Sequence, residues 1–352
     1  MPRPVGRLAA ADGSTAELDK PVSLSPAPAD GVLPDDFYSS TNLPTSLFLD
    51  NAWIDVEDVM MDKAIVVYTD QKRAVCRPIL EVKKGDLVVV GDDGIRIPAG
   101  PRAGRSGVFH FMGELTSPER PVPFTAKKVA ERMTKAKKQG KKIVAVAGPA
   151  VVHSGAVEPL ARMIRNGYIN VLLAGNALAV HDIEYALYGT SLGMSLSSDK
   201  HEPRGNRNHM KAINEVMKHG SIKVMVEKGV LKSGIMYECI KNSVPFALAG
   251  SIRDDGPIPE VIRDVVQAQA EYRRLLEGAE VALMLATGLH SVAVGNMLPS
   301  KVDVIVVDIN PAIVTKLIDR GTAQTFGIVS NVGGFLDMLE ANLSGSGSTT
   351  GP

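Results

Sequence analysis

Two kinds of hydrophobic pattern divide the chain. Between about Phe37 and Pro123, short runs of β-forming residues are separated by turns such as KKGD and DDG. Short strands joined by turns of this kind are typical of a small antiparallel domain, either a barrel or a sandwich. We therefore predict a small, mostly β domain here. Its strand-like runs are AIVVYTD (64–70), DLVVVG (86–91), IRI (95–97) and VFHFM (108–112).

The second pattern follows a proline-rich stretch, TSPERPVPF, near residue 117. A charged helical segment, TAKKVAERMTKAKKQGKK, comes first, and continuous apolar runs then alternate with amphipathic segments. This alternation is typical of a parallel sheet with helices on both faces, and we predict an open, doubly wound α/β sheet of about six strands. The strand-like runs are 141–148, 169–175, 244–250, 280–288, 301–308 and 323–330. The helix-like segments are 155–167, 208–220, 259–278 and 311–321.

These patterns divide the 352 residues into four predicted segments, a length that suits two domains. Residues 1–35 contain many breakers and are predicted to be extended or disordered. The β domain covers 36–123 and the α/β domain covers 124–343. The final segment, 344–352, is rich in Gly and Ser and is predicted to be a disordered tail.

Charge and cysteine usage narrow the class of protein. Lys plus Arg and Asp plus Glu both number 39, and this balance argues against a nucleic-acid or anionic-membrane partner. Apolar runs stay short of the roughly 20 residues of a membrane span, and the N-terminus lacks the apolar core of a secretory signal. The two isolated cysteines, Cys76 and Cys239, fit a reducing compartment and lack metal-ligand spacing. We predict a cytoplasmic protein without a metal site.

Ligands of open parallel sheets bind at the carboxyl ends of the strands, so the turns after the apolar runs are the candidate sites. Gly148 permits a tight turn after the first run, and Ser154 precedes a helix that could attract a phosphate. The G-x-G-x-x-G spacing is absent, so an ordinary turn is an equal alternative. Asn176 follows the next run and could bind a ligand or cap a helix. His181 comes next, and a lone histidine on a helix is more often structural.

The densest polar turn contains Arg253, Asp254 and Asp255, at the expected mouth of the site. The alternative is that the acids cap a helix near Pro259 and form a surface ion pair. A cap needs only one acid, so the pattern favours a functional role for at least one of the two.

Three later turns add candidate residues at the carboxyl ends of the predicted strands. Thr287 ends one apolar run, and His290 begins the helix after it. Asp308 ends another run, where an acid suits the ribose hydroxyls of NAD, although it could also cap the helix beginning near Pro311. Asn331 precedes a Gly-Gly pair that allows close backbone approach. Together the turns predict a nucleotide-binding α/β protein and do not identify a substrate.

Long strings at these turns carry a family resemblance. They include VAGPAVVHSGA, LLAGNALAVHDIE, SGIMYECIKNSVPFALAGSIRDDGP, HSVAVGNMLP and VVDINPAIVTKL. The sequence, from about Ala27 to about Leu343, resembles the family named for a lysine–oxoglutarate reductase/saccharopine dehydrogenase conserved region. Members include archaeal-type ornithine cyclodeaminases and the C-terminal part of cyanobacterial arginine dihydrolase. The resemblance also implies an N-terminal stretch before PADGVLPDD that is short or missing in this sequence.

The resemblance implies a Rossmann-like large domain similar to the NAD-binding fold of deoxyhypusine synthase, which would explain the missing glycine spacing. NAD is the implied cofactor. By motif match, its contacts are implied at Asn176, Ala177, Asp255, Thr287, Gly288, Leu289, His290, Asp308, Asn331 and Val332.

The implied reaction converts L-ornithine to L-proline and ammonia with catalytic NAD⁺, through removal and return of one hydride. Asp255 or Asp254 is the candidate catalytic base, and Arg253 is the candidate partner of the substrate carboxylate. Glu238 is a candidate for the δ-ammonium, with a solvated helix residue as the alternative. Cys239 is expected in the core.

Thr41 and Asn42, in the polar loop FYSSTNLPT, are candidates to reach over the site from the small domain. Two other functions remain open: an NAD-dependent amino-acid dehydrogenase of the saccharopine or lysine type, and a non-catalytic NAD-binding subunit. The Arg253–Asp255 turn favours an enzyme. The apolar helices and the fold analogy suggest a homo-oligomer such as a tetramer.

Overall fold

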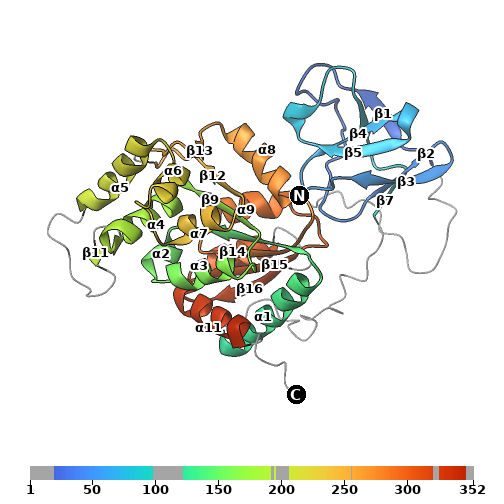
Figure 1. Cartoon of the computed structure of the whole chain (residues 1–352). Helices are drawn as coiled ribbons and strands as arrows, with labels where there is room; N and C mark the ends of the chain where they lie inside the picture. Colours follow the sequence, from blue (N-terminus) through green and yellow to red (C-terminus); the bar gives the residue numbers. More distant parts are fainter. Residues whose placement is uncertain are drawn as a thin grey trace. The chain divides into compact units, whose positions relative to one another are not determined.

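The computed structural model describes residues 20–97, 122–191, 194–195, 206–254, 256–319 and 325–345, which form two compact units. The smaller unit, called the β unit below, contains 20–97 and 296–301, and the α/β unit contains the other described residues. Figure 1 shows the elements of each unit. The predicted strand at 108–112 and the tail after 345 lie outside the described residues.

The β unit contains one seven-stranded sheet, in the order β1-β6-β4-β5-β3-β2-β7. Its neighbouring strands pair antiparallel except for β3 and β5, which confirms the predicted mostly β fold. Strand β1 belongs to the first 35 residues, which were expected to be extended or disordered, and it pairs with β6. The strands are β1 (Ser23–Pro26), β2 (Ser46–Leu49), β3 (Ala52–Glu57), β4 (Ala64–Tyr68), β5 (Arg73–Arg77), β6 (Leu87–Val90) and β7 (Ile95–Arg96).

The α/β unit contains a seven-stranded parallel sheet in the order β13-β12-β9-β8-β14-β15-β16. The apolar run from Ile143 to Ala147 in β8 is fully buried, as expected of a central strand covered on both faces. The parallel α/β prediction is therefore confirmed. The strands are β8 (Lys142–Ala147), β9 (Val171–Gly175), β12 (Phe246–Ala249), β13 (Val261–Ile262), β14 (Ala279–Leu285), β15 (Asp303–Asp308) and β16 (Thr325–Val329). A separate two-stranded ladder joins β10 (Thr190–Ser191) and β11 (Met194–Ser195).

Helices cover both faces of this sheet. In Figure 1, α8 and α9 lie on one side, and α1, α3 and α11 lie together on the other. The helices are α1 (Val122–Lys138), α2 (Ala150–His153), α3 (Val157–Arg165), α4 (Asn176–Tyr188), α5 (Asn206–His219), α6 (Ile222–Glu227), α7 (Ile235–Lys241), α8 (Val265–Leu276), α9 (Gly288–Met297), α10 (Pro311–Asp319) and α11 (Val332–Gly345).

The predicted helix over 259–278 is wrong in its first six residues. Val261 and Ile262 form the edge strand β13, which pairs with the end of β12. Helix α8 begins only at Val265, because the Asp264 carboxylate accepts hydrogen bonds from the Val266 and Gln267 N–H groups, each at 2.9 Å. Such a cap satisfies backbone donors that a helix start leaves unpaired and so defines the start here.

Within the part of the chain that the structure describes, no helix is both long and apolar enough to cross a membrane.

Candidate functional site

The parallel sheet places the predicted site residues on one edge, because the carboxyl ends of parallel strands all face the same way. Its strand order reverses between β8 and β14, and ligands of doubly wound sheets bind beside this reversal. The described candidates follow the ends of β9, β12, β14, β15 and β16: Asn176, Ala177, Arg253, Asp254, Thr287, Gly288, Leu289, His290, Asp308, Asn331 and Val332. Asp255, the first-choice base, lies outside the described residues.

The main chains of two turns are in contact at the reversal. The Gly148 N–H donates to the Leu285 carbonyl at 2.9 Å, and a Cβ added at Gly148 would stand 2.2 Å from the Ala286 carbonyl oxygen. Ala286 itself adopts a φ of 47°, which is uncommon for a residue with a side chain. Glycine at 148 is therefore required by the neighbouring strand, not by a glycine fingerprint.

Thr287 and His290 follow directly in the turn after β14 and the start of α9. The Thr287 hydroxyl lies 3.0 Å from His290 Nδ1. A Cβ at Gly175 would stand 2.8 Å from His290 Cε1, so this imidazole lies directly above the end of β9. Burial lowers the pKa of His290 while Asp254 acts in the opposite sense, which favours a neutral ring at neutral pH. The structure therefore brings the turns after β9, β12 and β14 together around His290.

Asn176 uses its side chain within the protein. Its Oδ1 accepts a hydrogen bond from the Ile258 N–H at 3.2 Å, its Nδ2 lies 3.5 Å from the Gly256 carbonyl, and the residue is buried. The amide therefore ties the polar turn after β12 to the end of β9. Asn176 does not cap α4, which begins after Gly175 without a side-chain cap, and its contact with a ligand stays a prediction.

The polar turn after β12 is not a helix cap. The Asp254 carboxylate accepts a hydrogen bond from the Ser251 N–H at 2.9 Å, which closes the turn locally. Arg253 is exposed. For Asp254 the capping alternative is wrong, because its carboxylate closes its own turn and Asp264 caps α8.

Asp308 ends β15 half-exposed, and its Oδ1 accepts a hydrogen bond from the Asn310 N–H at 2.8 Å. Asn310, not Asp308, caps α10, because Asn310 Oδ1 accepts from the Ala312 N–H at 3.0 Å. The predicted capping role of Asp308 is therefore wrong, since a residue nearer to Pro311 satisfies the first turn. The Asp308 carboxylate therefore lies at the carboxyl end of β15 and does not take part in capping α10.

At the end of β16, Asn331 caps α11 and lies exposed. Its Oδ1 accepts from the Gly333 N–H at 2.8 Å and from the Gly334 N–H at 3.2 Å. Val332 is buried, and a Cβ at Gly333 would stand 2.5 Å from the Ser154 carbonyl oxygen. This turn therefore touches the segment that follows β8.

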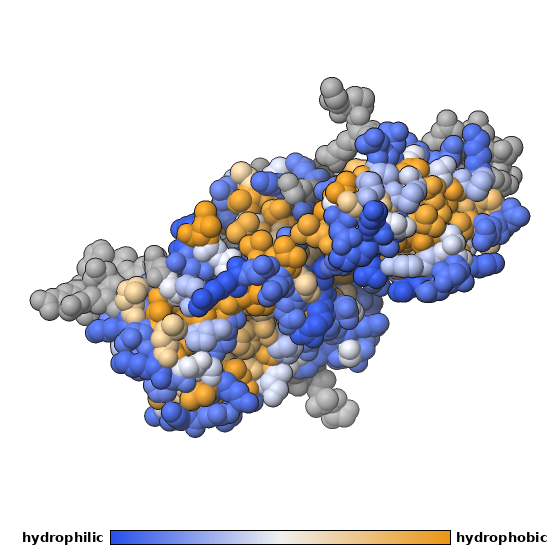
Figure 2. Space-filling view, turned by 90° about the horizontal axis from the view of Figure 1, so that it is seen from above, coloured by the Kyte–Doolittle hydropathy of each residue, from blue (hydrophilic) through white to orange (hydrophobic). Residues whose placement is uncertain are grey.

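Three of the turns expose a large apolar side chain: Ile252, Leu289 and Ile309, with Leu289 exposed by 70% and Ile309 by 69%. Figure 2 shows that apolar side chains on the visible face of the protein gather between polar ones. Exposed apolar groups beside polar strand ends suit a ligand that combines flat rings with hydroxyl and phosphate groups.

The other predicted residues form contacts within the protein. Glu238 is buried and pairs with Arg165 at 2.6 Å, so the alternative of a solvated residue is wrong and its carboxylate is held by a guanidinium. Cys239 is buried in the core, as expected. In the β unit, Asn42 is buried and its carbonyl accepts from Ser300, while Thr41 Oγ1 accepts from the Leu43 N–H at 3.2 Å.

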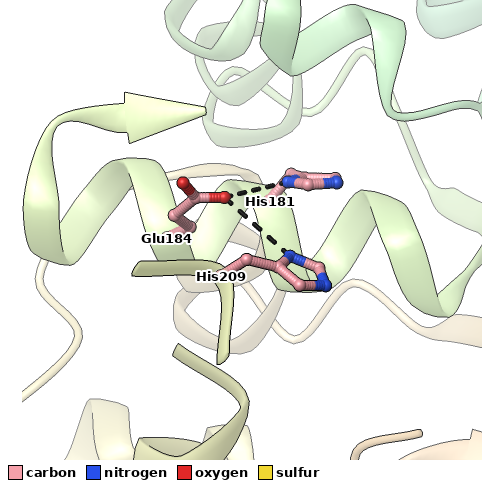
Figure 3. A group of neighbouring side chains, drawn as sticks. All are labelled: His181, Glu184 and His209. Atoms are coloured by element: carbon pink, nitrogen blue, oxygen red, sulfur yellow. Dashed lines mark hydrogen bonds and ion pairs between the residues drawn. The ribbon is translucent and has the colours of Figure 1, made fainter. Parts of the chain in front are cut away.

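A second polar cluster, on α4 and α5, was not assembled from the sequence (Figure 3). His181 Nδ1 lies 2.9 Å from Glu184 Oε2, and His209 Nδ1 lies 3.9 Å from the same oxygen. Such ligands also suit a divalent metal ion, a chemistry that the sequence analysis did not expect. The His-x-x-Glu spacing, which places both side chains on one helix face, was the available signal. His209 gave none, because only folding brings α5 to α4.

Two family descriptions match consecutive parts of the chain. "Arginine dihydrolase ArgZ-like, C-terminal, Rossmann fold" matches residues 127–339, and "Arginine dihydrolase ArgZ-like, C-terminal, first region" matches residues 44–126. A protein of Methanopyrus kandleri named ornithine cyclodeaminase is 57% identical over 92% of this chain and 78% of its own length. The bifunctional arginine dihydrolase/ornithine cyclodeaminase AgrE of Nostoc is 45% identical over 92% of this chain and 47% of its own length.

Solved structures agree with these matches. The crystal structure of a conserved LOR/SDH protein from Methanococcus maripaludis has a TM-score of 0.87 and 47% identity, and it covers 93% of this chain and 99% of that one. The ternary complex of AgrE with ornithine and NAD⁺ has a TM-score of 0.64 and 44% identity, covering 94% of this chain and 47% of that one. The chain therefore belongs to the family of the ArgZ-like arginine dihydrolase C-terminal region, together with the archaeal proteins named ornithine cyclodeaminase.

Proposed function

We propose that this protein is an ornithine cyclodeaminase, which converts L-ornithine to L-proline and ammonia with NAD⁺ as its resident cofactor. The observation that carries the proposal is the 57% identity to the Methanopyrus kandleri ornithine cyclodeaminase over 92% of the chain. The AgrE complex with ornithine and NAD⁺, at 44% identity, supports the same ligand pair. Proline formation and a place in arginine and ornithine metabolism follow from this reaction.

The carboxyl edge of the α/β sheet fits a dinucleotide. The glycine at 148 allows the turns at the strand-order reversal to meet, and Asp308 presents a carboxylate at the end of β15. Exposed Leu289 and Ile309 supply apolar surface next to these polar ends. We propose that Asp308 binds ribose hydroxyls and that the turn from Thr287 to His290 lines the cofactor.

NAD⁺ bound here would accept a hydride from the substrate α-carbon and supply it again to the cyclic imine. The residues of this chain bind and orient the substrate around that exchange. Arg253 is exposed at the same edge and is our candidate for the substrate carboxylate. Asp254 and Asp255 remain our candidates for the base that takes a proton from the α-ammonium.

The experiment is to incubate the purified protein with L-ornithine and NAD⁺ and to follow proline by mass spectrometry and NADH by absorbance. Proline without accumulation of NADH is the expected result. NADH in proportion to substrate, without proline, would indicate a dehydrogenase. Tight NAD⁺ binding without turnover of any amino acid would indicate a non-catalytic subunit.

We also propose a cytoplasmic location and a homo-oligomeric state. Exposed Val265 and Val266 on α8, together with Ile252, offer apolar surface for contact between copies. Light scattering on the purified protein would give its mass in solution; a monomer would contradict the oligomer proposal.

A further inference from the structure

The cluster on α4 and α5 is organised by one carboxylate. Glu184 is fully buried, its Oε1 accepts a hydrogen bond from the Thr190 hydroxyl at 2.9 Å, and its Oε2 lies 2.9 Å from His181 Nδ1. An ionised carboxylate only accepts hydrogen bonds, so His181 carries its proton on Nδ1 and presents Nε2 as an acceptor. His209 Nδ1 faces the same oxygen at 3.9 Å. Figure 3 shows the Nε2 atoms of both rings on the side away from Glu184.

A third imidazole completes the cluster. His153, at the end of α2, packs edge-on against His181 with ring centroids 4.7 Å apart, and the His209 ring lies at the same centroid distance from His181. His153 Nδ1 lies 2.6 Å from the Ser191 hydroxyl. Burial, and then the neighbouring His181, lower the pKa of His153 to about 4, so this ring is neutral at neutral pH. The cluster therefore combines a buried carboxylate with imidazole nitrogens that lie on the side away from it, which suits a cation that carries N–H donors.

We propose that His181, Glu184 and His209 form the binding site for the side-chain ammonium group of the substrate. The proposal rests on the function proposed above. A primary ammonium is a compact charge with three donors, whereas a guanidinium binds best through a planar, two-pronged contact with a carboxylate. The Glu184 carboxylate is covered by His181 and Thr190, so it acts through the imidazoles. Single acceptor nitrogens of this kind favour an amine such as ornithine over a guanidine such as arginine.

The position of the cluster fits the far end of the substrate. Helix α4 begins at Asn176 on the carboxyl edge, and His181 lies about one and a half turns further along it. Helix α2, which follows β8 and carries His153, packs against α4. In this proposal the reacting α-carbon lies at the cofactor edge, and the other end of the amino acid extends toward these two helices.

The site also supplies a proton acceptor for ring closure. One N–H proton moves from the side-chain ammonium to His181 Nε2, and Glu184 stabilises the imidazolium that results. The nitrogen, now neutral, leaves the cation site and forms the new C–N bond at the α-carbon, which the cofactor has oxidised to an imine. The α-nitrogen departs as ammonia, and the proton held by His181 leaves with it as ammonium.

The test compares two ligands by titration calorimetry in NADH-loaded protein, in which the cofactor cannot accept a hydride and the ligand is not turned over. The ligands are L-ornithine and L-norvaline, which lacks the side-chain amine. Wild-type protein should bind ornithine about 10- to 100-fold more tightly, as expected for charge-assisted hydrogen bonds. Glu184→Gln and His209→Ala should lower this ratio at least about 5-fold and leave norvaline binding nearly unchanged. His219→Ala, on the same helix α5 but outside the cluster, should keep the wild-type ratio.

An unchanged ratio in both cluster variants would overturn the proposal, and so would an equal loss for both ligands. Stoichiometric zinc in the purified protein, absent from Glu184→Gln, would also overturn it and assign the cluster to a metal. If the variants do not fold, ¹⁵N-histidine NMR of the wild-type protein decides: ornithine but not norvaline should shift imidazole resonances. Wild-type turnover to proline with an unchanged ratio refutes this inference alone, whereas an absence of proline refutes the proposed function.

Discussion

Gly148 lies so close to Ala286 that a Cβ at position 148 would stand 2.2 Å from the Ala286 carbonyl oxygen. The contact joins the ends of β8 and β14, the two strands between which the sheet order reverses. Backbone atoms cannot move aside as a flexible side chain can, so an alanine here would have to displace one of the two turns. The proposed cofactor edge therefore depends on this one close approach.

The same kind of contact at the end of β16 gives a matched pair of variants. Gly333→Ala would place a Cβ 2.5 Å from the Ser154 carbonyl oxygen, whereas Gly334→Ala meets nothing within 4 Å. We expect Gly333→Ala to weaken NAD⁺ binding at least about 10-fold and to destabilise the protein by roughly 1–3 kcal/mol. Gly334→Ala should keep its affinity and gain up to about 1 kcal/mol as a helical alanine. Calorimetry and urea unfolding measure both; equal behaviour of the two variants would contradict the expectation.

Asp308 tests the cofactor assignment directly. Because hydrogen bonds to a charged group contribute about 1.5–3 kcal/mol, Asp308→Ala should weaken NAD⁺ binding about 10- to 100-fold. Its preference for NAD⁺ over the 2′-phosphorylated cofactor should fall as well, since the carboxylate repels that phosphate. Asp319→Ala, an exposed acid at the other end of α10, is the control. Wild-type affinity and preference in Asp308→Ala would remove Asp308 from the site.

A substitution at Gly234 would test the contact between Asp182 and the first turn of α7. The Ile235 and Met236 N–H groups donate to Asp182 at 2.8 Å each, and a Cβ at Gly234 would stand 2.8 Å from both carboxylate oxygens. Gly234 also has a φ of 106°. Gly234→Ala should therefore lower the free energy of unfolding by about 2–4 kcal/mol.

Gly229→Ala is the matched control for that change. Its φ is 68°, and the nearest atom to an added Cβ is Lys232 Cε at 3.9 Å. Only the backbone cost of about 1–2 kcal/mol is expected. Urea unfolding of the two variants should separate them; a cost at Gly234 no larger than that at Gly229 would show that the Asp182 contact is not required.

His153 should make the free energy of unfolding depend on pH. Because burial lowers the pKa of His153 to about 4, the folded protein resists a proton that the unfolded chain accepts near pH 6.5. The stabilisation from this group is thus complete above about pH 6.5 and is lost as the pH falls toward 4. His153→Gln should lose less stability than wild type between about pH 7 and 4.5, measured by urea unfolding. An identical loss in both proteins would contradict a buried, neutral His153.

The parallel sheet could be predicted because each strand is a continuous apolar run, as Ile143 to Ala147 illustrates. The candidate edge followed from the sheet, since parallel strands end together. It was harder to predict which of several neighbouring polar residues caps a helix. Asn310 and Asp264 cap helices for which Asp308 and the acids after β12 were considered, and each is simply closer to the helix start.

The histidine cluster lay beyond sequence reasoning because it joins side chains from three helices. His153, His181 and His209 are far apart in the chain, and only the packing of α2, α4 and α5 brings them together. Burial also changed the interpretation of Glu238, which pairs with Arg165. Apart from the His-x-x-Glu spacing on α4, neither periodicity nor spacing indicates these contacts.

The most direct test of the central claim, an internal redox cycle on ornithine, uses L-ornithine deuterated at its α-carbon. The hydride taken from that carbon should return to it within one active site, so the proline formed should retain the deuterium at its α-carbon. Mass spectrometry and NMR of the product measure the label. Proline that keeps the deuterium, without net NADH, is the predicted result. Proline that has lost the deuterium, or deuterated NADH released in proportion to ornithine consumed, would contradict the account.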